Sequence, residues 1–125
     1  MDVSAENIAA LNRKTKLAGI TNITTQVGEA EKTILCQVCA DIVFFGIVLH
    51  DFQDPLEVLA NARLMIKPSG SLVNLDWKKE QSPFGPPEAI RFSQDKAIQL
   101  IESQGFKVKS VSNSGLYYYI IVAEL

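Results

Sequence analysis

The sequence predicts an α/β fold in which a mostly parallel sheet lies between two layers of helices and closes with an antiparallel C-terminal strand. Helical and strand patterns alternate along the chain with short turns between them, as is typical of parallel sheets. Residues 42–49 form an unbroken apolar run, which indicates a strand covered on both faces. The turn Asn113-Ser114-Gly115 lies between the last two strand patterns and indicates an antiparallel hairpin.

The first half of the chain contains one clear helical pattern and several short elements. Ser4 can cap a helix over residues 5–18, which a glycine then ends. Residues 23–27 have the composition of a short strand, and residues 31–38 carry a weak helical pattern. The strand at 41–49 follows, and we expect it to be the central strand of the sheet, with the most buried side chains.

The second half repeats the alternation of helix and strand. Asp54 caps a helix that ends at the turn Lys67-Pro68-Ser69-Gly70, and residues 71–77 form the strand behind it. A loop rich in proline and charge spans residues 78–92, and loops of this length are more often functional than idle. Ser93 then caps a third helix, which leads into the closing hairpin.

Composition narrows the classes of function. The chain has 125 residues, 47% hydrophobic content and a formal net charge of -2, so we expect one ordinary globular domain over residues 1–125. No block of Lys or Arg suggests a nucleic-acid surface. The apolar run is too short to span a membrane, and the N-terminus lacks a signal-peptide pattern. We therefore expect a cytoplasmic protein with neither nucleic-acid nor membrane partners.

Cys36 and Cys39 form a single C-x-x-C motif, which can be a redox pair or half of a zinc site. Two Cys and the single His of this sequence supply only three of four zinc ligands without carboxylates, so we expect no metal. The interpretation we favour is that both are small apolar residues on a short helix packed beneath the next strand.

Three local motifs stand in a recognisable order along the chain: Asp2-Val3-Ser4, Gly28-Glu29-Ala30, and the run from Asp41 to His50-Asp51. Residues 63–70, Arg-Leu-Met-Ile-Lys-Pro-Ser-Gly, form a fourth. Together they resemble the Rossmann-like (class I) S-adenosylmethionine-dependent methyltransferases. The nearest likeness is to the branch of the ubiquinone/menaquinone-biosynthesis and arsenite methyltransferases.

The resemblance implies S-adenosylmethionine as cofactor, held at its ribose hydroxyls, its adenine and its methionine portion. A carboxylate suits the ribose because it accepts two hydroxyl hydrogen bonds at once. The family more often has Asp than Glu at the adenine position. The residues concerned are, in that order, Asp2 with Val3, Glu29 with Ala30, and Gly46 with Ile47.

The same resemblance implies methyl transfer to a small-molecule substrate. His50 is the candidate for a catalytic base or substrate contact, because imidazole can be neutral near pH 7 and accept a proton. The alternative is that His50 ends the strand and bonds the neighbouring loop. Trp77, Phe84 and Arg91 are candidates for lining a substrate pocket beneath the long loop. Alternatively, the two aromatic residues simply cover the end of the sheet.

Members of the resembled family begin with a helix, a first strand and a glycine-rich loop, whereas none of the seven glycines here stands in a G-x-G pattern. We therefore expect the C-terminal two-thirds of a methyltransferase domain, truncated at its N-terminus and lacking the first strand. Its function is either methyl transfer, incomplete as it stands, or that of a non-catalytic fragment persisting as an oligomeric folded module. We expect residues 23–27 to pair directly with residues 42–49 in a five-stranded sheet, and a homodimer to bury the remaining apolar surface.

Overall fold

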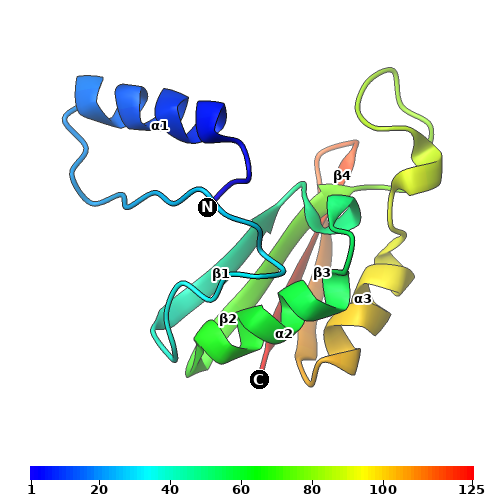
Figure 1. Ribbon diagram of the computed structural model, residues 1–125. Coiled ribbons are helices and arrows are strands. Elements are labelled where there is room, and N and C mark those ends of the chain that lie inside the picture. The colour runs from blue at the N-terminus through cyan, green and yellow to red at the C-terminus, as the bar shows by residue number, and fades with distance from the viewer. The chain divides into compact units, whose positions relative to one another are not determined.

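The computed structural model describes residues 1–125 and divides the chain into two compact units, Met1–Thr33 and Ile34–Leu125. Figure 1 labels the helices and strands of both units. A single domain over the whole chain stays a prediction. None of the helices has the length and apolar character that crossing a membrane requires.

The first unit consists of a helix and an extended return (Figure 1). Helix α1 spans Ala5–Leu17, and the Ser4 hydroxyl oxygen caps it by accepting a hydrogen bond from the backbone N–H of Asn7 at 3.1 Å. The chain leaves the helix through Gly19, whose φ of 67° lies in the left-handed region that glycine adopts at little cost. The predicted helix and both of its ends are confirmed.

The strand predicted at residues 23–27 is wrong. Only Val27 forms a bridge, parallel to Asp2: the N–H of Asp2 donates to the Gln26 carbonyl at 3.2 Å, and the N–H of Gly28 donates to the Asp2 carbonyl at 3.0 Å. The physical reason is the length of the partner, because α1 begins at residue 5 and leaves too little extended chain for a ladder. The five-stranded sheet predicted with these residues is therefore also wrong.

The second unit is built on a four-stranded sheet in the order β1-β2-β4-β3 (Figure 1). β1 pairs in parallel with β2, and β4 is antiparallel to both β2 and β3. Three strands thus run in one direction while the C-terminal strand runs in the opposite one, as predicted. The strands are β1 (Ala40–Gly46), β2 (Ile66–Trp77), β3 (Lys107–Ser114) and β4 (Tyr118–Glu124).

Two helices of this unit, α2 (Pro55–Met65) and α3 (Gln94–Ser103), lie on one face of the sheet (Figure 1). Their predicted caps are confirmed. The Asp54 carboxylate accepts hydrogen bonds from the first turn of α2 at 3.1 Å, and the Ser93 hydroxyl accepts from the N–H of Lys96 at 3.2 Å. Two short 3-10 turns complete the unit, at Leu49–Asp51 and Glu88–Ile90.

The core lies between the helices and the two inner strands. Alternate side chains of β2 and β4 have no exposed surface, as the period of two in a strand requires when one face is covered. The fully buried set comprises Leu72, Asn74 and Asp76 from β2, Tyr119, Ile121 and Ala123 from β4, and Leu59, Ala62, Ala97 and Ile101 from the helices.

The prediction that residues 41–49 form the central and most buried strand is wrong. β1 stands at the edge of the sheet and ends at Gly46. Phe45 points to the helical side and is 8% exposed, but Phe44 and Ile42 are 57% and 63% exposed. An edge strand has a single neighbour, and α2 covers only one of its faces, so alternate residues of the apolar run remain at the surface.

The helix predicted at residues 31–38 is also wrong, as is the packed position expected for its cysteines. The segment is a turn closed by a disulfide between Cys36 and Cys39, and Cys39 is exposed. The N–H groups of Val38 and Cys39 donate to the last carbonyls of α2 instead of forming a helix of their own. Val38 has a φ of 48°, which breaks any helical path.

Candidate functional site

The carboxyl ends of the parallel strands β1 and β2 lie at the same edge of the sheet, where ligands bind in open α/β sheets. The chain leaves β1 at Gly46 and turns at Ile47, whose N–H donates to the Leu75 carbonyl at 2.7 Å. Ile47 has a φ of 60°, an unfavourable conformation for a β-branched residue. Such backbone strain clusters at functional sites, and the sequence carried no signal for it.

Gly46 is exposed at the end of β1. A Cβ atom at this position would lie 2.8 Å from Cε1 of Phe44, closer than real contacts allow. The exposed ring of Phe44 can move aside, so the absence of a side chain at Gly46 matters mainly because it leaves the strand end open to an approaching ligand.

His50 lies just beyond this turn, within Leu49–Asp51, and its side chain is only 2% exposed. Its Nδ1 lies 2.7 Å from Oδ1 of Asp76, and its Nε2 lies 3.3 Å from Oδ1 of Asp51. A carboxylate oxygen can only accept, so an ionised Asp76 requires a proton on Nδ1, and Nε2 can act as an accepting nitrogen only when it does not face an ionised Asp51. Because Asp51 is exposed, it can turn away and free Nε2.

Asp76 is the residue that sequence reasoning missed. It lies near the carboxyl end of β2 and is completely buried, which raises the pKa of its carboxyl group, while the Trp77 N–H and the neighbouring His50 oppose that shift. The available signal was the alternation Leu72, Asn74, Asp76, which places two polar side chains on the buried face of a strand.

Further polar groups surround Asp76 in the core. Its Oδ2 has no hydrogen-bond partner, and neither side-chain atom of Asn74 has one. Burial, and then the charge of Asp76, raise the pKa of Tyr119, whose hydroxyl donates to the Phe92 carbonyl at 3.3 Å. The covered face of the sheet thus has a polar cluster beneath His50, formed by Asn74, Asp76 and Tyr119.

Arg91, predicted to line a substrate pocket, holds the long loop in place. Its guanidinium is buried and donates to the carbonyls of Lys78, Glu80, Phe84 and Pro86 and to the Ser82 hydroxyl. It also lies over the Trp77 ring, 4.9 Å from the centroid. These contacts satisfy loop carbonyls that would otherwise lack partners.

The structure does bring the three predicted substrate residues together. Phe84 packs edge-on against Trp77 with ring centroids 5.8 Å apart, and Tyr118 packs on the same indole at 4.5 Å. Gly85 completes the contact: its φ is 95°, and a Cβ there would lie 2.8 Å from the Trp77 ring. Trp77 is buried while Phe84 is more than half exposed, so Phe84 presents the accessible aromatic surface.

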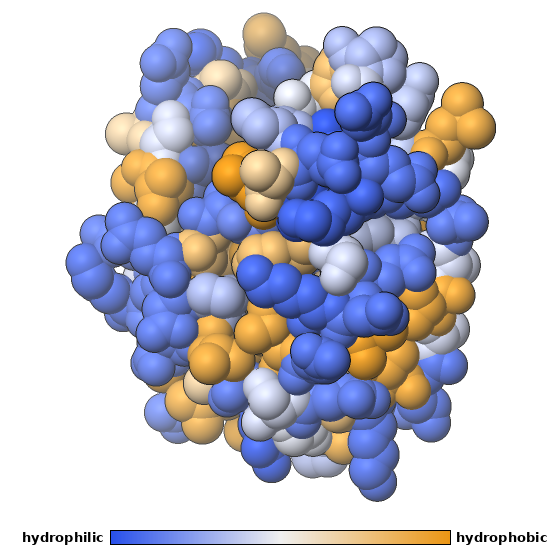
Figure 2. All heavy atoms as spheres, turned by 90° about the vertical axis from the view of Figure 1, so that its right-hand side faces the viewer, coloured by the Kyte–Doolittle hydropathy of each residue, from blue (hydrophilic) through white to orange (hydrophobic).

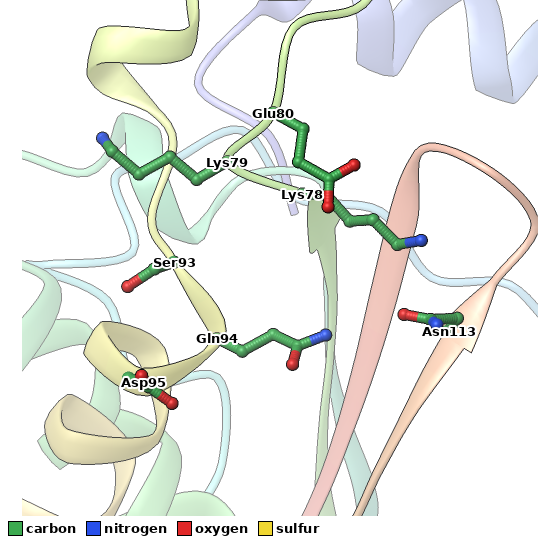
Figure 3. A pocket seen from close by; sticks show the side chains of 7 residues that line it. All are labelled: Lys78, Lys79, Glu80, Ser93, Gln94, Asp95 and Asn113. Carbon is green, nitrogen blue, oxygen red and sulfur yellow. The ribbon is translucent and has the colours of Figure 1, made fainter.

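Two open cavities lie along this loop. One of about 460 Å³ is bordered by the loop itself, including Phe84 and Arg91. The other, of about 400 Å³, opens between the end of β2, the start of α3 and β3; Figure 3 shows its mixed polar lining. That lining comprises Lys78, Lys79, Glu80, Ser93, Gln94, Asp95 and Asn113.

In the first unit, the bridge between Asp2 and Val27 brings the predicted ribose and adenine segments side by side. The Asp2 carboxylate accepts from the Ser4 N–H at 2.7 Å and from the Asn7 amide at 3.1 Å. These bonds lower the pKa of Asp2 and keep it ionised. Glu29 forms an exposed ion pair with Lys32 at 2.7 Å. Val3 is exposed and Ala30 half-buried.

These residues fit the donors of a nucleoside. A carboxylate has about four lone-pair sites, and the two bonds to Asp2 leave room for hydroxyl donors. The ion pair of Glu29 is exposed and can exchange for another donor at little cost. Gly46 and Ile47 belong to the second unit.

Known structures match the chain along nearly its whole length. A SAM-dependent methyltransferase from Aquifex aeolicus superposes with a TM-score of 0.91 at 27% identity, covering 97% of this chain and 64% of that one. A putative type 11 methyltransferase from Sulfolobus solfataricus gives 0.73 at 23% identity, covering 94% and 66%. The trans-methyltransferase CalH, in complex with SAH, gives 0.77 at 20% identity, covering 99% and 41%.

The chain thus spans less than two thirds of the length of each of these proteins. No curated protein matches the sequence significantly. The family model described as "Methyltransferase domain" matches residues 1–74, which is 74 of 125 residues and more than half of the chain. The chain belongs to this methyltransferase domain family.

Proposed function

We propose that the protein catalyses S-adenosylmethionine-dependent methyl transfer to a small-molecule substrate in the cytoplasm, in or near the ubiquinone/menaquinone and arsenite branch. The observation that supports this best is the likeness to the Aquifex aeolicus enzyme, at 27% identity and a TM-score of 0.91 over 97% of the chain. Because the chain spans 64% of that structure, the activity is proposed for the whole protein.

The cofactor contacts proposed for the first unit follow from the acceptors there. Asp2, already ionised, accepts the ribose hydroxyls, with Val3 beside it. Glu29 exchanges Lys32 for the adenine amino group, and Ala30 flanks the ring. S-adenosylmethionine, when bound, supplies a methyl group activated by its sulfonium. The carboxylates bind and orient the nucleoside.

In the second unit, Gly46 and Ile47 are proposed to face the methionine portion of the cofactor. Gly46 offers open backbone, while the N–H of Ile47 is already used by Leu75, so Ile47 contributes the shape of the turn. His50 is proposed as the base: Asp76 holds its Nδ1, and Nε2 receives a substrate proton once Asp51 turns away. Trp77 and Phe84 form the aromatic wall for the substrate, and Arg91 supports their loop.

Calorimetric titration of the chain with S-adenosylhomocysteine tests the cofactor proposal. We expect weak binding, above micromolar Kd, because no G-x-G loop supplies backbone donors and each hydrogen bond to a charged group is worth about 1.5–3 kcal/mol. Asp2→Asn should weaken it further, whereas Asp41→Asn, which alters an exposed ion pair with Lys67, should leave it unchanged. Micromolar binding by the chain alone would contradict the predicted affinity, and equal binding by both variants would contradict the assignment of Asp2.

A second candidate function is a non-catalytic module that persists as a homodimer. The observation favouring it is the sheet face opposite α2 and α3, which no helix of the second unit covers and which exposes Ile42 and Phe44. An apolar sheet face and an open strand edge favour association with a second copy. A stable dimer needs about 1,000 Å² or more of total buried area.

Analytical ultracentrifugation tests the dimer. The chain should sediment as a dimer at tens of micromolar, and Phe44→Lys should convert it to monomer because a charge then has to enter the interface. Leu64→Lys, which alters an exposed apolar residue of α2 on the other side of the sheet, is the control and should remain dimeric. A monomeric wild-type chain at that concentration would overturn the proposal.

A further inference from the structure

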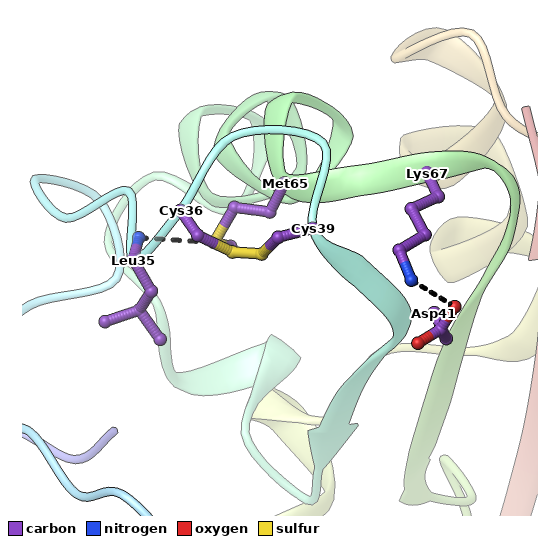
Figure 4. The surroundings of a disulfide bond; sticks show 6 residues. All are labelled: Leu35, Cys36, Cys39, Asp41, Met65 and Lys67. Carbon is purple, nitrogen blue, oxygen red and sulfur yellow. Dashed lines mark hydrogen bonds and ion pairs between the residues drawn. A yellow bond between two sulfur atoms is a disulfide. The ribbon is translucent and has the colours of Figure 1, made fainter.

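We propose that Cys36 and Cys39 form a reversible dithiol–disulfide site, open to small disulfides of the glutathione class, whose oxidised form fixes the C-terminal end of α2 and the start of β1. Figure 4 shows the disulfide in the turn that leads into β1, with Met65 of α2 beside it. Neither the methyl-transfer proposal nor the dimer uses this pair.

The accessibility of the sulfur atoms supports exchange with small molecules. Cys39 is exposed and Cys36 is half-buried, so a small thiol or disulfide can reach Cys39 first. The turn belongs to no helix or strand, and its exposed neighbours Gln37 and Val38 do not cover it. Thiol–disulfide exchange requires such access, and structural disulfides usually lack it.

The turn that contains the two cysteines provides hydrogen-bond donors for the C-terminal end of α2. The last carbonyls of a helix have no partner within the helix. Here the N–H of Val38 donates to the Leu64 carbonyl at 3.0 Å, and the N–H of Cys39 donates to the Met65 carbonyl at 2.9 Å. The N–H of Leu35 also points at Sδ of Met65, at 3.4 Å. The disulfide-closed turn is thus the C-terminal cap of α2.

The backbone conformation of Val38 explains why the turn depends on the disulfide. Val38 is β-branched and has a φ of 48°, which an open chain avoids. The start of β1 is weakly held in addition, because the strand has a single neighbour and its register with β2 shifts between Ala40 and Ile42. Opening the disulfide lets Val38 return to an ordinary backbone conformation, and both capping hydrogen bonds are then lost.

The chemistry balances with a small disulfide as oxidant. The Cys39 thiolate attacks the small disulfide and releases one thiol, and the Cys36 thiolate then attacks the mixed disulfide at Cys39 and releases the second. Two electrons pass from the protein to the small disulfide, and the protons of the two cysteines leave to form the two small thiols. Two thiols reverse the reaction.

Intact-mass measurement in glutathione buffers tests the site. In oxidised glutathione the wild-type chain should lose two hydrogen atoms, carry no adduct and resist alkylation, and reduced glutathione should restore two alkylatable thiols. Cys36→Ser should accumulate a glutathione adduct at Cys39, because the resolving thiol is absent. Two free thiols, or a stable mixed disulfide, on the wild-type chain in oxidised glutathione would overturn the proposal.

Hydrogen exchange tests the cap itself. The amides of Val38 and Cys39 should exchange about tenfold faster or more in the reduced chain, while core amides of β2 such as Leu72 keep their rates. In the double variant Cys36→Ser/Cys39→Ser, these two amides should exchange at the same fast rate in either buffer. Slow exchange of both amides in the reduced wild-type chain would overturn the link between the disulfide and the helix end.

Discussion

The two faces of the sheet in the second unit differ sharply in the burial of their side chains, although both contain many apolar residues. On the face toward α2 and α3, the central side chains of β2 and β4 are completely buried. On the opposite face, Val73, Leu75, Ile120 and Val122 are half-buried, and the β1 residues next to them are exposed. Both faces carry apolar side chains, but the covered face also holds the polar cluster of Asn74, Asp76 and Tyr119, and only that face has helices of its own unit over it.

An apolar strand sequence therefore indicates that its side chains have to be buried, but it does not indicate which element buries them. The surface seen from the side of α3 is mostly hydrophilic, with hydrophobic areas between the polar side chains (Figure 2), as is usual for the exterior of a folded protein. The sheet face opposite α2 and α3 exposes Ile42 and Phe44 of β1. We read it as a surface that a second copy covers, which is the dimer proposed above.

The largest difference in folding stability is expected between variants of the two phenylalanines of β1, which lie on opposite faces of the sheet. Phe45→Ala should lower the free energy of unfolding by about 3–5 kcal/mol, because it leaves a cavity against the helical layer and Phe52. Phe44→Ala should cost about 1 kcal/mol or less in dilute protein. Urea unfolding measures both, and equal costs would break the comparison. A cost at Phe44 that grows with protein concentration would sharpen it in favour of the dimer.

A smaller loss of folding stability is expected at the long loop, which covers the end of the sheet face opposite α2 and α3. Arg91→Lys should cost about 1–3 kcal/mol, because a single ammonium cannot satisfy the loop carbonyls that the guanidinium reaches. Limited proteolysis should then cut within residues 78–91. Arg63→Lys is the matched control, since Arg63 is exposed and donates to the Gln104 carbonyl. If both variants resist protease like the wild type, the loop does not depend on Arg91.

The smallest effect concerns the polar cluster on the covered face. Burial raises the pKa of Asp76 above its ordinary value of 3.8, so the folded state retains a proton that the unfolded chain releases. Its contribution to stability is complete below pH 3.8 and is lost as the pH rises through the raised pKa. Asp76→Asn removes this dependence. As the pH rises from 3, the free energy of unfolding of the variant should therefore gain on that of the wild type by about 1.4 kcal/mol per unit by which the pKa of Asp76 is raised. Thermal unfolding at a series of pH values measures this difference, and parallel curves for the two proteins would contradict it.

For the candidate site, sequence reasoning found His50 but not its partner. His50 ends an apolar run and is conspicuous there, whereas Asp76 lies within the strand predicted at residues 71–77, where only the alternation with Leu72 and Asn74 marks it as a buried polar residue. The two residues are 26 positions apart in the sequence and meet only because β1 and β2 pair in parallel and their carboxyl ends lie together. Arg91 was predicted from the sequence as a substrate residue beneath the long loop, and only the folded loop reveals the carbonyl partners that its guanidinium also binds.

The sequence by itself determined the local elements: the capped helices, the closing hairpin and the apolar character of β1 all follow from residues within a few positions of one another. Tertiary structure alone decided that β1 lies at the edge, that residues 23–27 form one bridge and no strand, and that the turn closed by Cys36 and Cys39 caps α2. These outcomes depend on pairing between distant segments, and the free energy of such pairing is set by which partners are present and how long they are.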